Sequence, residues 1–114
     1  MTKPTEDALW PRASHWLSSP SAVAGTASTT CDIAVYGVRA HRTSISATGA
    51  NHTPAAVRAA LARYSTWAWS SETSVGGLVA QDFGDSIFPD SPEGEAATAE
   101  LAGRATKGSK LAIA

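Results

Sequence analysis

The chain has 114 residues, and nine Lys and Arg side chains against ten Asp and Glu side chains give it a net charge of −1. This length allows at most one domain. Because no basic cluster occurs, neither nucleic acid nor an anionic membrane surface is an expected partner. No apolar run approaches the roughly 18 residues of a membrane span, and no secretory signal is evident. We therefore expect a cytoplasmic protein.

Large aliphatic side chains are scarce in this sequence. Apolar residues make up 43% of the chain, but 23 of them are alanine, and Leu, Ile, Val and Phe together number 18. That share is below the roughly 20% floor of a globular domain, while the balanced charge argues against disorder. We interpret the thin core as a sign of missing packing partners. The lone Cys31 excludes an internal disulfide and suits a reducing compartment, and without a nearby base it is not an expected nucleophile.

Ordered structure is expected to begin at residue 31. Residues 1–30 are rich in Ala, Ser and Thr, with Trp10 and Trp16 as large anchors, and predict an irregular N-terminal arm with one helical turn or a flexible tail. The segment "CDIAVYGV" then predicts a buried strand over 31–38, because it is short and rich in β-branched residues.

Two helices and two more strands follow. "TPAAVRAALARY" predicts a helix with Thr53 as N-cap and Pro54 at its first position, and with an apolar stripe of Val57, Leu61 and Tyr64. "GLVAQDFGD" predicts a second strand. Ser91 and Pro92 open a second helix that ends at Gly108, and "SKLAIA" predicts a third strand.

The order β-α-β-α-β predicts a parallel sheet at 31–114, the start of a three-layer αβα domain. A parallel sheet needs both faces covered and its strands paired. Two modest helices and three strands begin that arrangement without completing it, so we expect an apparently truncated α/β domain.

Ligands of open α/β sheets bind beyond the carboxyl ends of the strands, where two loops fall in this sequence. The first loop carries His41, Arg42, Asn51 and His52, and the second carries Asp82, Asp85 and Asp90. A metal site pairing His41 or His52 with Asp82 and Asp85 is conceivable, but no pair has the spacing of converging ligands. The alternative is that the aspartates fix a turn and the histidines are solvated.

Two other kinds of site have weaker support. "TGANHTP" leads into a helix N-terminus, which attracts anions, yet it matches neither glycine-rich phosphate-binding pattern, and Pro54 removes one amide donor. Ser44, Ser46 and Thr48 lie near His41 and His52 in the sequence, but without the context of a nucleophile elbow.

Three motifs, taken in order, resemble the start of a ureohydrolase of the arginase, agmatinase and formimidoylglutamase family. They are "DIAVYGV", "TGANHTPAAVRAAL" with Arg58 at the position of the family's helix arginine, and "DFGD". The chain departs from the family in having Thr53 where glycine is usual and "GVRAHR" where Gly-Val-Pro-x-Asp is common. The resemblance covers roughly residues 31–114.

The resemblance implies an enzyme that hydrolyses a guanidino or formimino C–N bond, with two Mn²⁺ ions as cofactors that activate water. It implies that the metal ligands lie in segments after the third strand, so that residues 1–114 contain no catalytic or metal-ligating residue and are inactive alone. His41, Arg42, Asn51 and His52 would form a substrate-entrance loop, or else only shape that loop or a subunit contact. The family also implies a homo-oligomer.

Two alternatives remain open at this point. The chain could be a short non-enzymatic interaction module that self-associates, or pairs with a partner, through the open edge of its third strand. It could also be a small ligand-binding α/β domain, for which the sequence offers no fingerprint.

Overall fold

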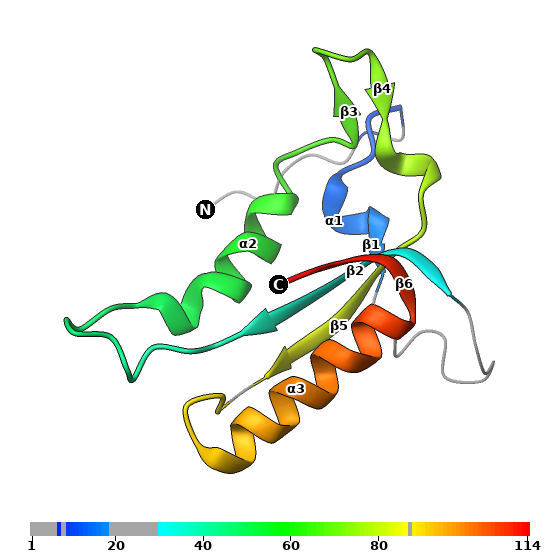
Figure 1. The fold of residues 1–114 in the computed structure, drawn as a ribbon. Coiled ribbons are helices and arrows are strands. Elements are labelled where there is room, and N and C mark those ends of the chain that lie inside the picture. Colours follow the sequence, from blue (N-terminus) through cyan, green and yellow to red (C-terminus); the bar gives the residue numbers. More distant parts are fainter. Residues whose placement is uncertain (1–6, 8, 19–29, 87) are drawn as a thin grey trace.

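A four-stranded parallel sheet organises the chain (Figure 1). The structure is a computed structural model that describes residues 7, 9–18, 30–86 and 88–114. The strand order is β1-β5-β2-β6. The strands are β1 (Leu17–Ser18), β2 (Cys31–Val38), β5 (Ala80–Ser86) and β6 (Ser109–Ile113). The prediction of a mixed α/β fold with parallel strands is confirmed.

β2 lies in the middle of the sheet because it is the strand with the longest apolar, β-branched run. Its Ile33 is opposite Ala80 of β5 on one side and Leu111 of β6 on the other. The pairing with β5 shifts register between Val35 and Gly37. β1, which the sequence did not predict, adds Leu17 beside Ala80 on the far side of β5. Part of the N-terminal arm therefore belongs to the sheet.

The two predicted helices lie on opposite sides of this sheet (Figure 1). Helix α3 (Pro92–Lys107) begins and ends as predicted, with Ser91 as N-cap and Gly108 as C-cap. The Ser91 hydroxyl accepts a hydrogen bond from the Gly94 amide at 3.0 Å, which satisfies a free donor of the first turn. Leu101 and Ala105 of α3 are buried against the sheet.

Helix α2 (Thr53–Leu61) differs from its prediction at both ends. Its N-cap is His52, not Thr53, because the 3₁₀ turn η2 (Ala50–His52) runs directly into it and leaves Thr53 helical. The helix stops at Leu61, three residues before Tyr64. The apolar stripe is largely open to solvent, since Val57 is 52% and Tyr64 64% exposed. No residue of α2 is buried.

The remaining elements gather beside the amino ends of the central strands. The arm contains the predicted helical turn, α1 (Ala13–Trp16), and the Trp16 Nε1 donates a hydrogen bond to the Leu78 carbonyl at 2.8 Å. A small hairpin joins β3 (Trp67–Ala68) to β4 (Thr73–Ser74). The 3₁₀ turn η3 (Val75–Gly77) follows, so β5 begins at Ala80 and not at Gly77 as predicted. Residues 1–6, 8 and 19–29 of the arm lie outside the described part.

The packed core is small, as the composition predicted. Cys31, Ala34 and Ala105 form its buried centre, and Tyr36 and Phe83 pack against them while partly exposed. Among the described residues, Cys31 is the largest side chain that is fully buried. Within the same part of the chain, no helix has both the length and the apolar character to cross a membrane.

Candidate functional site

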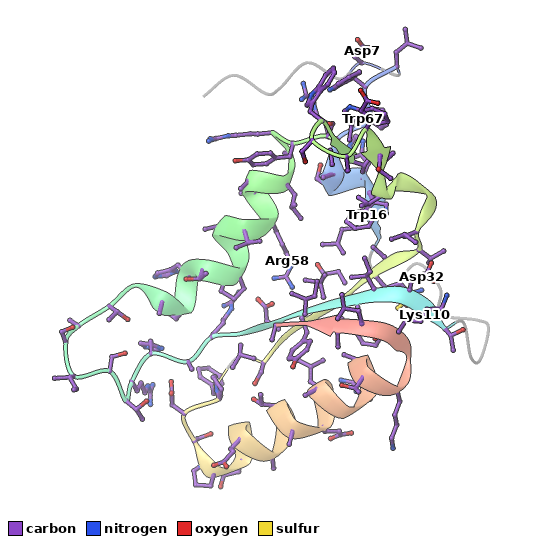
Figure 2. All side chains as sticks on the ribbon, turned by 45° about the horizontal axis from the view of Figure 1, so that its top comes forward. Asp7, Trp16, Asp32, Arg58, Trp67 and Lys110 are labelled. Atoms are coloured by element: carbon purple, nitrogen blue, oxygen red, sulfur yellow. The ribbon has the colours of Figure 1, made fainter. Side chains whose placement is uncertain are left out.

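Arg58 of α2 points toward the sheet (Figure 2), where it binds two carboxylates of β5. Its Nε and Nη2 donate to Asp82 at 2.6 and 2.8 Å, and its Nη1 donates to Asp85 at 2.6 Å. A second arginine, Arg39 at the end of β2, donates from Nε to Asp85 at 3.1 Å. The cluster of Arg39, Arg58, Asp82 and Asp85, called here the strand-end ion cluster, joins two strands to a helix.

The backbone brings the two carboxylates to the same side of the sheet. Gly84 has a φ of +78°, which side chains rarely allow, and its amide donates to Asp82 Oδ1 at 2.8 Å. The resulting irregularity places Asp85 opposite Gly37 of β2. A side chain at position 37 would overlap the Asp85 carboxylate and meet Pro54 Cβ at 2.7 Å. Asp82 therefore holds the irregular backbone at Gly84, and Asp85 holds β5 to Arg39 and Arg58.

Arg58 and Asp82 hold each other in the ionised state. Burial by itself would raise the pKa of Asp82, but hydrogen bonds from Arg58 and from the Gly84 amide outweigh it and lower the pKa. The hydrogen bond to Asp82, with a further one to Asp85, raises the pKa of Arg58 against the opposing effect of burial. Two cations thus balance two anions, and the carboxylates are committed to structural contacts.

The predicted entrance loop is divided between two places. Asp90, after β5, accepts hydrogen bonds from the backbone amides of His41 and Arg42 at 3.2 and 3.3 Å. The His41 Nδ1 lies 3.6 Å from the same carboxylate and 3.2 Å from the Arg39 carbonyl. Asp90 therefore fixes the start of the loop after β2 against the loop after β5.

Asn51 and His52 sit at the other end of that loop, in η2 immediately before α2. Asn51 is half-buried and His52 is exposed. No hydrogen bond among the described residues joins either side chain to His41 or Arg42. The four residues share a loop, but the structure does not bring them together into one polar pocket.

The donor groups of these loops do not assemble a metal site. Within the described residues, no three His, Cys, Asp or Glu side chains lie close enough together to hold an ion. Asp82 and Asp85, the carboxylates considered for a metal together with His41 or His52, instead bind Arg58. The described residues thus do not provide a site for the two manganese ions that the resemblance implies. No catalytic step is assigned to these residues.

A hollow of about 420 Å³ lies between α2 and the sheet, next to the strand-end ion cluster. Apolar side chains form most of its wall, and Arg58 is its charged component. The hollow exists because α2 stands off the sheet and buries none of its residues. The apolar lining residues include Leu17, Val35, Val57, Leu61 and Ile113.

No family model matches this chain, and neither a curated protein nor a solved structure matches it. Function is therefore argued from the geometry of the site.

Sequence reasoning singled out Arg58 and the two aspartates but missed Arg39. It also missed that the rings of Trp10, Trp67 and Trp69 lie together. Arg39 follows β2 directly, which is the position from which a side chain reaches the end of a neighbouring parallel strand. The spacing of Trp67 and Trp69 in "TWAWS" was the available signal for a two-stranded element, since alternate residues share one face of a strand.

Proposed function

We propose that this chain forms the first part of a ureohydrolase-type α/β domain that acts on a guanidino or formimino C–N bond. The observation that carries the proposal is the strand-end ion cluster. Arg58 comes from the second motif of the resemblance and Asp82 and Asp85 from the third, and the fold joins them at hydrogen-bond distance. Motifs that are weak one by one thus meet as one structural unit.

The position of this unit supports the same proposal. Ligands of open α/β sheets bind beyond the carboxyl ends of parallel strands, and the cluster holds those ends of β2 and β5 together. The loop that begins with His41 and Arg42 is fixed there by Asp90. In the proposed enzyme, residues 31–114 would form a scaffold of a three-layer αβα domain and one rim of the substrate site.

The proposal assigns the metal chemistry to polypeptide other than the residues described here. Two Mn²⁺ ions would supply activated water when bound, and their ligands would come from segments outside residues 1–114. The roles left to this chain are to position the rim loop and to hold the strand ends. The 114-residue chain by itself is therefore expected to be inactive.

The test compares the natural product with the 114-residue chain. The natural product is purified through an antibody to the exposed loop, its intact mass is set against 11.7 kDa, and Mn²⁺-dependent release of urea or formamide is measured. The substrates are arginine, agmatine and formiminoglutamate. We expect a larger product that hydrolyses one of them, and no hydrolysis by the 114-residue chain. If the natural protein hydrolysed none of the guanidino and formimino compounds tried, the proposal would be wrong.

A second candidate function is non-enzymatic association through β6. This strand is paired with β2 on one side and lies at the edge of the sheet. Its Leu111 and Ile113 are 55% and 46% exposed, which leaves an apolar edge open to another strand. Sedimentation of the chain at micromolar concentration tests the candidate.

A defined homo-oligomer that Leu111→Lys dissociates would favour the second candidate. Ile45→Lys is the matched control, because Ile45 is fully exposed in the loop after β2 and lies outside the edge strand. A monomer, or aggregation that both substitutions affect equally, would reject the candidate.

A further inference from the structure

Three tryptophans form a cluster at the end of the molecule remote from Arg58. The cluster consists of Trp10 from the arm and Trp67 and Trp69 from the hairpin. The ring centroids of Trp10 and Trp69 are 6.3 Å apart with planes inclined by 31°, and those of Trp67 and Trp69 are 6.2 Å apart and nearly perpendicular at 85°. One exposed ring thus has a second ring beside it and a third at a right angle.

These rings remain open to solvent although the backbone that carries them is held in place. Trp10, Trp67 and Trp69 are 44%, 37% and 74% exposed. The hairpin is closed by the β3–β4 pairing and by the Val75 amide, which donates to the Thr66 carbonyl at 2.9 Å. The arm is attached to it by a bridge between Arg12 and Ser65. The cluster is therefore a fixed surface feature and not part of the core.

A small hollow adjoins the cluster. Its volume is about 160 Å³, and Trp10 and Trp67 form part of its wall with Leu9, Pro11, Thr66 and Ser74. Pockets for drug-sized ligands run from roughly 300 to 1,000 Å³. This hollow is suited to a small headgroup and not to a large ligand.

Acidic and basic side chains both lie near the cluster in the chain. Within residues 7–11 and 65–74, which carry the three rings, the charged side chains are Asp7 and Glu72. Asp7 accepts the Leu9 amide at 2.9 Å, in the turn that leads to Trp10, and the Glu72 amide donates to the Trp69 carbonyl at 3.4 Å. Figure 2 shows Asp7 at the same end of the molecule as Trp67, away from Arg58. Arg12 and Arg63 flank the two segments.

We propose that the tryptophan cluster binds an alkylated ammonium group, such as a trimethylammonium cation. The face of an aromatic ring attracts a cation, tryptophan does so most strongly, and groups of aromatic rings recognise quaternary ammonium ligands. Perpendicular rings let the cation contact two faces at once, while the acidic side chains in the same turns complement its charge. The site is independent of the ureohydrolase proposal, because it shares no residue with the strand-end ion cluster.

The test uses choline and its neutral isostere 3,3-dimethylbutan-1-ol, each titrated with the 114-residue chain. Binding is followed by the NMR shift of the ligand methyl protons, which the ring currents of the tryptophans move upfield. We expect choline to bind about tenfold more tightly than the neutral alcohol. Trp69→Leu, which keeps an apolar side chain but removes the most exposed ring, should weaken choline binding about tenfold with an unchanged circular dichroism spectrum.

Phe88→Leu is the matched control, because Phe88 is an aromatic side chain 67% exposed outside the two segments of the cluster. It should leave choline binding unchanged. Phosphatidylcholine vesicles form a second arm, in which co-sedimentation identifies a lipid headgroup as the source of the cation, and binding of choline alone identifies a free ligand. Equal binding of choline and the neutral alcohol, or no shift with choline at millimolar concentration, would overturn the proposal.

Discussion

Arg58 and Asp82 form a bidentate ion pair, in which Nε lies 2.6 Å from Oδ2 and Nη2 lies 2.8 Å from Oδ1. The two residues are 24 positions apart, one on α2 and the other on β5. Since α2 buries none of its residues, this pair is a principal attachment of the helix to the sheet. The planar guanidinium makes both bonds at once, which a lysine cannot do.

Replacing Arg58 should release α2 from the sheet. We expect Arg58→Ala to lower the free energy of unfolding by about 2 kcal/mol, because two partly buried carboxylates lose their charged donors. Arg58→Lys should retain less than half of the stability that Arg58→Ala loses, since the lysine ammonium is a point charge and cannot bind a carboxylate in a bidentate way. Urea denaturation followed by circular dichroism measures both.

Arg63→Ala is the control for these variants, because Arg63 is an exposed arginine just beyond the end of the same helix. It should change the free energy of unfolding by no more than about 0.5 kcal/mol. A loss of the same size in Arg63→Ala and Arg58→Ala would show that the ion cluster has no special part in stability.

Acid should weaken the same attachment. Burial tends to raise the pKa of Asp82, but the hydrogen bonds from Arg58 and Gly84 prevail and hold it below its ordinary value of 3.8. A carboxylate with a lowered pKa in the folded state stabilises that state fully above pH 3.8 and ceases to do so as the pH falls through the lower, folded value. Asp82→Asn should therefore destabilise the chain at pH 6, and the difference should shrink below about pH 4. Urea denaturation at pH values from 6 to 2.5 measures it, and a constant difference over that range contradicts the assignment.

The sequence predicted the α/β part of the fold because the residue patterns of β2 and α3 match the environments that these elements occupy in the structure. The β-branched run of β2 suits a strand with neighbours on both sides, and the Ser91-Pro92 start and Gly108 end of α3 depend on local backbone chemistry alone. α2 was predicted too long, and its apolar stripe is mostly exposed, since Val57 and Tyr64 face no complete partner layer. A periodic pattern reports which side of a helix is apolar, not what covers that side.

Two glycines should respond to alanine in opposite directions. Gly37 is buried where Asp85 and Pro54 converge, so an added methyl group must displace the ion cluster, and Gly37→Ala should cost about 1 to 3 kcal/mol. Gly103 lies in the interior of α3 with open space around its Cα, so Gly103→Ala should stabilise the chain by about 0.5 to 1 kcal/mol.

Thermal and urea unfolding of the two variants, side by side, check both signs. The pair controls for the general effect of removing glycine flexibility from the unfolded chain, which stabilises either variant alike. If Gly37→Ala proved as stable as the parent chain, Asp85 could not lie against β2 as the structure has it.

The candidate site was only partly predictable for a different reason. Arg58, Asp82 and Asp85 stood out because motifs carry them, whereas their direct contact depends on the crossover that lays α2 over β2 and β5. The contact of Asp90 with the amides of His41 and Arg42 involves backbone donors, which every sequence possesses. Such contacts depend on the fold and cannot be predicted from residue types.

Cys31 should report on the opening of the core. The thiol is 2% exposed and its Sγ lies 3.4 Å from the Gly108 carbonyl, and burial raises its pKa above the ordinary value of 9.0. Both the shielding and the smaller thiolate fraction slow its attack on a disulfide reagent. We expect modification by 5,5′-dithiobis(2-nitrobenzoic acid) at pH 8 to be at least tenfold slower than that of an exposed cysteine, and to accelerate with urea in step with unfolding.

The exposed reference is Ser70→Cys in a Cys31→Ala background, because Ser70 is exposed in the turn of the hairpin. Since β2, α3 and the start of β6 meet at Cys31, slow labelling requires these three elements to be packed together in solution. Equal modification rates for the two cysteines in the absence of urea would mean that β2 is not packed against its neighbours in solution. In that case the strand-end ion cluster, at the opposite end of β2, would lack the rigid base on which its geometry depends.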